Sequence, residues 1–298
     1  MSDVTDRIRV ACAQVAERAR AVRIVKEAIP AYAAALPIGD PAGSTPTMPG
    51  AREQSAAFWL TLDAINFGSG WFPTLRKRPG MSGYETVASG LREHGPWPAA
   101  ELRRIDAAQV ARTLGQDPDH ELMELFAVSL RDLGTRVERE HDGRFEAVVD
   151  GCTAVGMVER LAGWPCFADS SRYGELEVPF LKRAQIAAAD LVRAGVAAFD
   201  DVHRLTMFAD NLVPHVLRMD GVLRFSDELG ARIEREELIE HGSPEEVEIR
   251  ACAVHAVELI VAERPGSRAA DVDELLWNRG RGRRYKARPR HRCRCTAY

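Results

Sequence analysis

The chain has 298 residues, of which 46% are hydrophobic and 28% charged, and its formal net charge at pH 7 is −4. These are the values of an ordinary globular protein, so they exclude general disorder, and the negative charge excludes a general attraction to nucleic acid. No apolar stretch reaches the about 20 residues of a membrane-spanning helix, and residues 1–6 lack a signal-peptide pattern, so we expect a soluble, cytoplasmic protein.

The cysteines give little indication of a shared site. Most are isolated among apolar residues, where a reduced thiol behaves as a small hydrophobic side chain. Cys293 and Cys295 are separated by one residue, and no second Cys/His pair follows at zinc spacing, although His291 nearby leaves a metal site as the alternative. We therefore expect no disulfide, no metal and no cofactor.

Basic residues are dense between 279 and 294, although the chain is acidic overall. Such a run is typical of a solvated or nucleic-acid-attracting segment. The aromatic residues around it, Trp277, Tyr285 and Tyr298, favour instead a tail that packs back on the body of the protein. Phosphate binding by this tail is the sharper of the two interpretations, and composition alone leaves both open.

Apolar residues recur at three- and four-residue steps along most of the chain, and the alternation typical of strands is scarce. The pattern predicts the following elements: a helix over 5–30, a surface loop over 37–52, a helix over 98–114, another starting at 117–119, one bracketed by Gly143 and Gly163, and one over 244–264 in which Ser243 and Glu246 form a capping box. We therefore expect an all-α, mainly helical fold with few or no strands. Residues 1–298 form a single globular helical domain in this interpretation, with an N-terminal helix and loop over 1–55 and a basic tail over 279–298.

One short element narrows the fold further. Residues 214–219 are predicted as a helix, 220–223 as a tight turn around Gly221, and Ser226 as the cap of the next helix. Helix, glycine-containing hairpin and helix is the arrangement of helix-hairpin-helix proteins, which include the DNA glycosylases. This element favours a DNA-glycosylase-like helical fold.

Residues 58–73 are the first segment that could carry chemistry. They place aromatic side chains beside Asn66 and end in a Gly-Ser-Gly break before Trp71. A core element running into a loop explains most of these residues. Aromatic faces also stack on nucleobases, and a neighbouring amide can bind a base edge, so Asn66 and Trp71 are candidates for ligand contact.

Lys182 opens a helix after Pro179, in a chain that otherwise uses arginine for nearly all of its positive charge. A lysine placed beside apolar residues can be present for its compact ammonium group. Chance is the alternative explanation of this single lysine.

Residues 199–211 are the segment richest in chemistry. Asp201 can cap the following helix, whereas Asp210 ends an apolar turn where a charge needs a partner. Cleavage of an N-glycosidic bond develops positive charge on the sugar, and a carboxylate beneath the sugar stabilises or captures that cation. Phe199 would supply a stacking surface next to Asp201.

Residues 271–277 add acids and an aromatic residue near the tail. A capped short helix explains them, yet Asp273 and Trp277 could face a pocket while Asp271 serves as the cap. The histidines have no partner at catalytic spacing, and no glycine-rich phosphate loop, G-x-S-x-G or H-E-x-x-H motif is present.

With these segments in hand, the chain resembles the queuosine salvage protein family, the queuosine 5′-phosphate N-glycosidases. The resemblance rests on LDAINFGSGWFP, VPFLKRAQI, FDDVHRLTMFADNLVPHVLRMDGVLRF, HGSPEEVEIRACAVHAVE, DELLWNRG and YKARPRHRCRC, which follow one another in the family's order. It covers about 58–298, and Cys293 and Cys295 stand where it leads us to expect hydroxyl residues.

The resemblance implies a helical fold related to DNA glycosylases and hydrolysis of queuosine 5′-phosphate to queuine and ribose 5-phosphate without a metal, a membrane or a stable nucleic-acid partner. It implies that Asp201 is the catalytic carboxylate, with Asp210 as the second candidate. The expected substrate contacts are Phe199 as the stacking residue, Asn66 and Asp273 as polar contacts of the base, Lys182 and Tyr285 at the phosphate or ribose, and Trp71, Trp277 and His291 around them.

Two other functions are compatible with the same residues. The first is a DNA glycosylase or a nucleosidase of ordinary purines, and a duplex-binding enzyme would show strongly salt-dependent affinity for DNA. The second is a non-catalytic helical module that binds nucleotide or RNA through the basic tail. Such a module would bind queuosine 5′-phosphate without forming ribose 5-phosphate.

Overall fold

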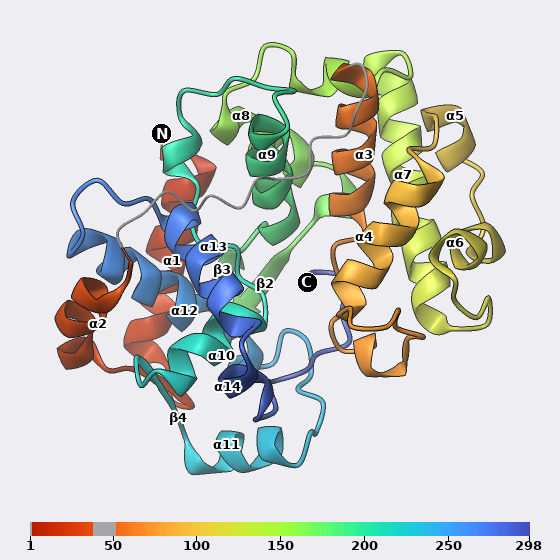
Figure 1. Cartoon of the computed structure of the whole chain (residues 1–298). Helices are drawn as coiled ribbons and strands as arrows, with labels where there is room; N and C mark the ends of the chain where they lie inside the picture. The colour runs from red at the N-terminus through yellow and green to blue at the C-terminus, as the bar shows by residue number, and fades with distance from the viewer. Residues whose placement is uncertain (1, 38–51) are drawn as a thin grey trace.

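The computed structural model describes residues 2–37 and 52–298 and confirms the mainly helical class (Figure 1). The loop predicted over 37–52 lies, apart from its two end residues, outside the described residues. The α-helices are α1 (Val4–Arg18), α2 (Ile29–Ala35), α3 (Arg52–Ala64), α4 (Gly83–His94), α5 (Ala99–Leu102), α6 (Ala107–Leu114), α7 (Glu121–His141), α8 (Ala154–Ala162), α9 (Lys182–Arg193), α10 (Leu212–Met219), α11 (Asp227–Glu234), α12 (Pro244–Ala262), α13 (Ala269–Gly280) and α14 (Arg283–Lys286).

Short strands and 3-10 helices connect them. The strands are β1 (Val22–Ile24), β2 (Ser170–Tyr173), β3 (Leu176–Pro179) and β4 (Leu223–Phe225), and the 3-10 helices are η1 (Lys26–Ala28), η2 (Phe72–Thr74), η3 (Phe145–Val149), η4 (Pro165–Phe167) and η5 (Val202–Arg204). Strands β1 and β4 pair antiparallel, as do β2 and β3. Among the described residues, no helix combines the length and the apolarity needed to span a membrane.

The helices form two groups that α8 and α9 join (Figure 1). In the first group α12 packs along α1 and also contacts α2, α10 and α13. In the second group α3 and α7 pack together, and α4, α5 and α6 cover them. Helix α9 packs on α3 and on α8, which in turn contacts α1, and the final residues of the chain lie between the two groups (Figure 1).

The single helix predicted over 5–30 is wrong, because the chain leaves the helix after Arg18. The Glu248 carboxylate on α12 accepts hydrogen bonds from the backbone N–H groups of Arg20, Ala21 and Val22, at 3.0, 2.6 and 3.0 Å. Residues 22–24 then pair with β4. Pro30 lies in the first turn of α2, where its missing N–H costs nothing, and does not end a longer helix.

The helix predicted over 98–114 is also interrupted. Asp106 and Gln109 form a capping box, with Asp106 Oδ1 accepting from the Gln109 N–H at 2.7 Å, and a new helix begins at Ala107. The start predicted at Ser243 is confirmed, since Ser243 Oγ accepts from the Glu246 N–H at 3.3 Å. The second half of the predicted capping box is wrong. The Glu246 carboxylate accepts from the Gly242 N–H, at 3.1 Å, where the capping box requires the Ser243 N–H.

A fully buried ion pair holds the centre of the molecule. The Arg250 guanidinium on α12 donates to both carboxylate oxygens of Asp169, at 3.0 and 2.7 Å, and its Nε donates to the Ala209 carbonyl at 3.0 Å. The guanidinium carbon lies 3.9 Å from the ring centre of Phe180 and 4.6 Å from that of Tyr298. Two planar hydrogen bonds and two aromatic faces suit arginine and would not suit lysine.

We expect Arg250→Met to lower the free energy of unfolding by about 3 to 5 kcal/mol, because it leaves Asp169 as a buried carboxylate without its partner. Arg250→Lys should also destabilise the protein, since an ammonium cannot replace the bidentate contact. Chemical denaturation measures both. The control is Arg172→Met, which removes the exposed 3.5 Å pair with Glu175; equal effects of R250M and R172M would contradict the role of the buried pair.

Candidate active site

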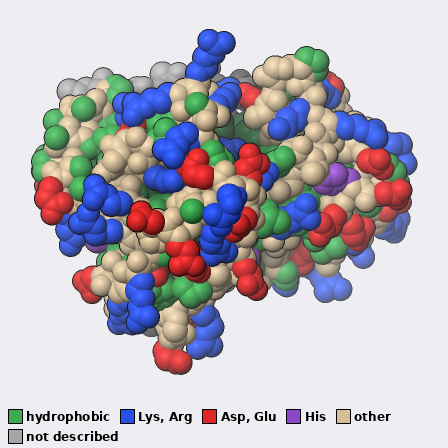
Figure 2. Space-filling view, turned by 90° about the horizontal axis from the view of Figure 1, so that it is seen from below, with side chains coloured by type: hydrophobic (Ala, Val, Ile, Leu, Met, Phe, Trp, Pro, Cys, Tyr) green, Lys and Arg blue, Asp and Glu red, His purple; other side chains and the backbone are tan. Residues whose placement is uncertain are grey.

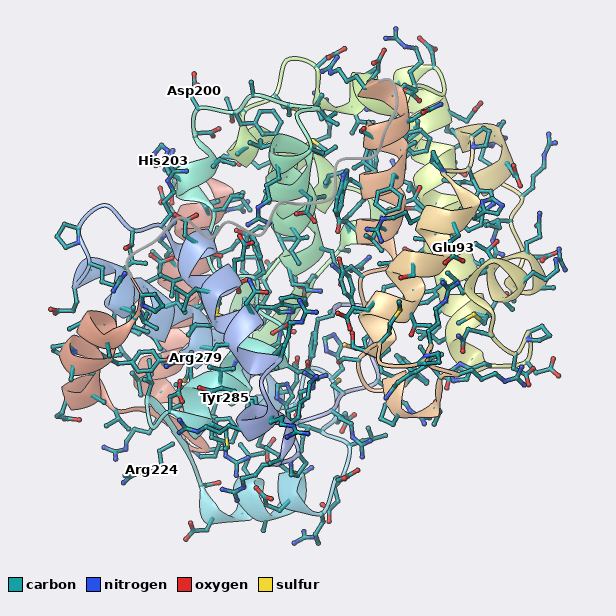
Figure 3. The ribbon with its side chains drawn as sticks, viewed as in Figure 1. Glu93, Asp200, His203, Arg224, Arg279 and Tyr285 are labelled. Atoms are coloured by element: carbon teal, nitrogen blue, oxygen red, sulfur yellow. The ribbon has the colours of Figure 1, made fainter. Side chains whose placement is uncertain are left out.

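A cavity of about 500 Å³ lies where α9, α13, the loop after α3 and the basic tail meet. Helix α9 presents one face to it, since Lys182, Ile186, Asp190 and Arg193 follow at helical spacing and all line the cavity. Tyr285 of α14, labelled in Figure 3, marks the tail's side of the cavity. The cavity therefore collects residues from segments that are far apart in the sequence.

Asp210 is the carboxylate of the cavity that is held by a helix end. Its Oδ1 accepts hydrogen bonds from the first N–H groups of α10, from Leu212 at 2.8 Å and from Val213 at 3.1 Å. No hydrogen bond to Oδ2 occurs among the described residues, so this oxygen is available to a bound molecule. The helix end thus fixes a carboxylate at the cavity wall without using both of its oxygens.

Two buried acids also line the cavity. Burial, together with the charge of nearby Asp210, raises the pKa of Asp273 well above its usual range, and Asp273 Oδ1 accepts from the Phe208 N–H at 3.1 Å. Burial raises the pKa of Asp190 to about 6, against the opposing effect of Arg193 at 3.1 Å. The raised pKa favours the protonated form of Asp273, which can act as a hydrogen-bond donor or an acid.

An unusual backbone conformation at the preceding residue places Lys182 at the start of α9. Leu181 before it has the left-handed φ of 50°, and the Lys182 N–H donates to Asp169 Oδ2 at 3.0 Å. Its Nζ donates to the backbone carbonyl of Asn66 at 2.8 Å and to Asn66 Oδ1 at 3.2 Å. Burial lowers the pKa of Lys182 to about 8, so the ammonium is available as a cation at neutral pH.

Aromatic and basic side chains complete the lining. Tyr84 and Trp277 meet edge to face with ring centres 6.1 Å apart, and both line the cavity. Arg290 in the tail also lines it, and makes no hydrogen bond or ion pair with any described residue although burial lowers its pKa. An arginine kept half-buried without a partner has its donors free for an anionic ligand.

On the molecular face shown in Figure 2, basic and acidic side chains alternate. This face therefore has no broad patch of one charge. A duplex-binding protein needs a broad basic patch to bind the phosphates. The free positive charge of Arg290 lies instead inside the cavity wall.

The structure brings six of the residues proposed from the sequence to this cavity and places four elsewhere. Those that line it are Asn66, Lys182, Asp210, Asp273, Trp277 and Tyr285. Those that do not are Trp71, Phe199, Asp201 and His291. The Tyr285 hydroxyl is already engaged, since it lies 2.9 Å from Asp220 Oδ1, so its contribution to the cavity is its ring.

Asp201 caps a helix other than the one that follows it. Its two carboxylate oxygens accept from the N–H groups of Ala154 at 2.6 Å and Val155 at 3.1 Å, at the start of α8. These hydrogen bonds lower the pKa of Asp201 against the effect of its partial burial. Figure 3 shows the neighbouring Asp200 and His203 at the outer edge of the molecule, far from Tyr285.

The other three residues outside the cavity have structural contacts. Phe199 is buried in the main core. The Trp71 indole N–H donates to Glu121 at 2.7 Å. His291 is buried, its backbone carbonyl accepts from Asn211 Nδ2 at 3.2 Å, and burial lowers the pKa of its ring to about 3.

Sequence reasoning missed Asp190, Tyr84 and Arg290 as cavity residues. Asp190 could have been found, because it lies two helical turns after Lys182 inside the apolar stretch AAADLV, where a charged residue needs an explanation. Tyr84 is brought to the cavity by the packing of α4, which no local pattern reveals. Arg290 is one of many arginines in the tail, and only the fold distinguishes it.

The fold and the cavity define a helical protein suited to a small ligand that has an aromatic part, a cationic part and an anionic part. The chain belongs to the queuosine salvage protein family, whose model matches residues 46–298. It is 34% identical over the whole of both chains to a Sphaerobacter thermophilus protein named queuosine 5′-phosphate N-glycosylase/hydrolase. A Dictyostelium discoideum protein of the same name is 40% identical over 80% of this chain and 77% of its own length.

We expect Asp190→Asn to change how stability depends on pH. Since the pKa of Asp190 is raised to about 6, its protonated form favours folding below about pH 4, and this contribution is lost as the pH rises through 6. Asparagine does not ionise, so the free energy of unfolding of D190N relative to the wild type should rise by about 2 kcal/mol between about pH 4.5 and 8. Denaturation at several pH values measures it.

The exposed Asp119 provides the control, since D119N should follow the wild type at every pH. A constant difference between D190N and the wild type over this range would contradict the effect of burial on Asp190.

Proposed function

We propose that this protein hydrolyses the N-glycosidic bond of queuosine 5′-phosphate, with water, to queuine and ribose 5-phosphate, and so provides queuine for tRNA modification. Membership of the queuosine salvage protein family and the names of the relatives support the substrate. The observation that carries the chemistry is the pair of acids in one cavity wall, Asp210 held by α10 and the buried Asp273.

Asp210 is the carboxylate that we propose at the anomeric carbon. As the bond to the base breaks, positive charge develops on the ribose, and Oδ2 of Asp210 would stabilise this cation or bond to it. Water then adds to the same carbon, loses a proton and gives ribose 5-phosphate. The sequence favoured Asp201 for this role, but the hydrogen bonds of Asp201 to α8 leave it outside the cavity.

Asp273 is the group that we propose for the departing base. The base leaves with the electron pair of the glycosidic bond, and a protonated carboxyl group can donate to it. The charge of Asp210 adds to burial in raising the pKa of Asp273, which favours its protonated form and so a role different from that of Asp210. The Tyr84 and Trp277 rings offer apolar contact to a flat base, and Asp190 and Glu274 suit the ammonium group of queuine.

The basic tail is where we propose the 5′-phosphate. Arg290 is the cavity arginine whose donors no described residue uses, and a guanidinium can bind a phosphate through two parallel hydrogen bonds. The Lys182 ammonium adds a further positive charge to the cavity. These cations would also balance the several carboxylates around them.

We also propose that the fold is of the helix-hairpin-helix, DNA-glycosylase-like type. Helix α10, the turn at Gly221 and helix α11 with its cap at Ser226 follow the expected order. Strand β4 lies between the turn and α11 and pairs with β1, so the turn is anchored to the N-terminal part of the chain. This unit carries Asp210 at the start of α10.

We expect Asp210→Asn to lower kcat about a thousandfold, because the amide cannot neutralise the developing cation. Asp201→Asn should keep kcat within a few-fold, since the Asp201 carboxylate lies outside the cavity and accepts from N–H groups at the start of α8, while its stability falls by about 1 kcal/mol. Chromatographic detection of released queuine measures kcat, and denaturation measures stability. The reverse order, with D201N inactive but folded and D210N active, would overturn the assignment.

We expect Arg290→Met to raise KM for queuosine 5′-phosphate by about 10- to 100-fold, the loss of one charged hydrogen-bonding group, with a smaller change in kcat. The free nucleoside queuosine should be hydrolysed equally by R290M and the wild type, because it has no phosphate. Arg283→Met, in the same tail but exposed and outside the cavity, is the matched control. An equal loss for nucleoside and nucleotide would place the phosphate elsewhere.

A further inference from the structure

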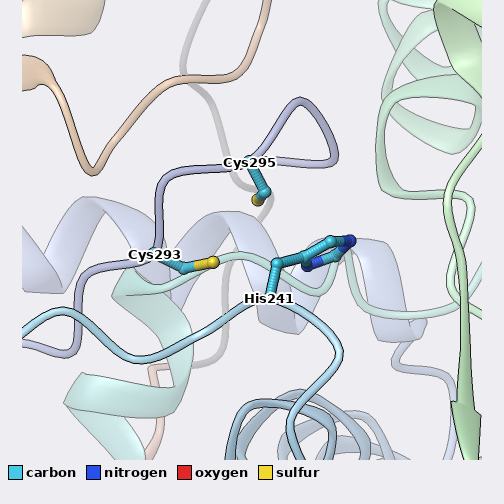
Figure 4. A group of neighbouring side chains, drawn as sticks. All are labelled: His241, Cys293 and Cys295. Carbon is cyan, nitrogen blue, oxygen red and sulfur yellow. The ribbon is translucent and has the colours of Figure 1, made fainter.

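Three side chains of types that bind metals lie together at the basic tail, although the sequence does not place them in one motif. His241 lies in the loop before α12, and Cys293 and Cys295 lie in the tail (Figure 4). One ligand atom from each lies within 4.8 Å of the others. Both cysteines are buried, whereas His241 is partly exposed.

This spacing is close to what a tetrahedral zinc ion requires. Zinc binds cysteine sulfur at about 2.3 Å and histidine nitrogen at about 2.0 to 2.1 Å, so its ligand atoms lie about 3.5 to 3.8 Å apart. The three ligand atoms lie within 4.8 Å of one another, so binding a shared ion would require them to come somewhat closer together. Two thiolates would balance the two charges of the ion.

A buried carboxylate stands beside the imidazole. Glu246 Oε2 lies 3.6 Å from His241 Nδ1, and Glu246 is completely buried. Its Oε1 accepts no hydrogen bond from any described residue and lies 3.7 Å from Arg250 Nη1. Metal-bound histidines are usually oriented by such a carboxylate, and a tetrahedral site also needs a fourth donor, which this carboxylate or water can supply.

The position of the cluster explains why an ion would be useful there. The buried apolar residues at the end of the tail, Cys293, Cys295, Ala297 and Tyr298, form a cluster of their own beside the main core. So small a cluster contributes little hydrophobic stabilisation, and small units of this kind are commonly held by a metal or a disulfide. His241 also lines a second cavity, of about 1010 Å³, through which an ion can enter.

We propose that His241, Cys293 and Cys295 bind one zinc ion, which fastens the basic tail to the loop before α12. The ion is structural, and the cavity that contains Asp210 does not include these three residues. By fixing Cys293 it also fixes the preceding tail residues, among them Arg290 at the cavity wall. The sequence predicts no metal here because the third donor comes from a distant loop.

The experiment measures the zinc content of the full chain, produced with zinc in the medium and purified with a reductant and without chelators. Elemental analysis should give one zinc per chain for the wild type. Cys293→Ser, Cys295→Ser and His241→Ala should each lose most of it. Cys152→Ser, which changes a half-buried cysteine outside the cluster, should keep it. Removal of zinc from the wild type should lower the melting temperature by about 5 °C.

Cobalt substitution of the wild type keeps the test decisive if a variant fails to fold. Cobalt in this site should show the thiolate-to-metal charge-transfer band and the strong visible bands of tetrahedral sulfur coordination. The proposal is overturned by wild-type protein that contains no zinc and shows no such bands, or by a C293S/C295S double variant that keeps its zinc. A mass lower by two hydrogens, from a Cys293–Cys295 disulfide in zinc-free protein, would also overturn it.

Discussion

The buried pair of Arg250 and Asp169 is the interaction on which both the core and the cavity depend. Asp169 accepts the N–H of Lys182 at the start of α9, and Arg250 binds the carbonyl of Ala209, the residue before Asp210. One guanidinium therefore fixes the backbone on both sides of the cavity wall. Its remaining faces are covered by the Phe180 and Tyr298 rings, so the tail is positioned by the same group.

The helical class could be predicted from the sequence because periodicity and caps are local. At the start of α12, for example, a serine, a proline and a glutamate follow one another in the expected order. The end of α1 could not be predicted, since the residues after Arg18 favour a helix and only the Glu248 carboxylate on α12 holds them out of it. The strands could not be predicted either. Each has only three or four residues, which is too few to show a clear alternation, and the pairing of the strands is set by the fold.

The sequence indicated which segments form the candidate site more readily than it indicated the role of each residue in them. Asp201 and Asp210 lie in one run, and each accepts two backbone N–H groups of a helix start. Asp210 binds the helix that follows it, whereas Asp201 binds α8, which precedes it in the sequence. Only the fold distinguishes a helix cap on the outer surface from a helix cap at a cavity wall. Residue type and spacing could therefore not show which of the two aspartates lies at the cavity.

The cavity contains groups that reduce stability, and this distinguishes it from the Arg250 core. In that core Arg250 and Asp169 pair with each other, whereas Asp190 and Asp273 are buried acids that are costly to ionise, and Arg290 is half-buried without a partner among the described residues. A chain selected only for stability would replace them with apolar residues. Their retention around one cavity is explained if a ligand supplies the missing partners: an anion for Arg290 and a departing base for Asp273. The paired core makes this arrangement possible, because it holds the backbone of the wall in place while the wall itself stays unpaired.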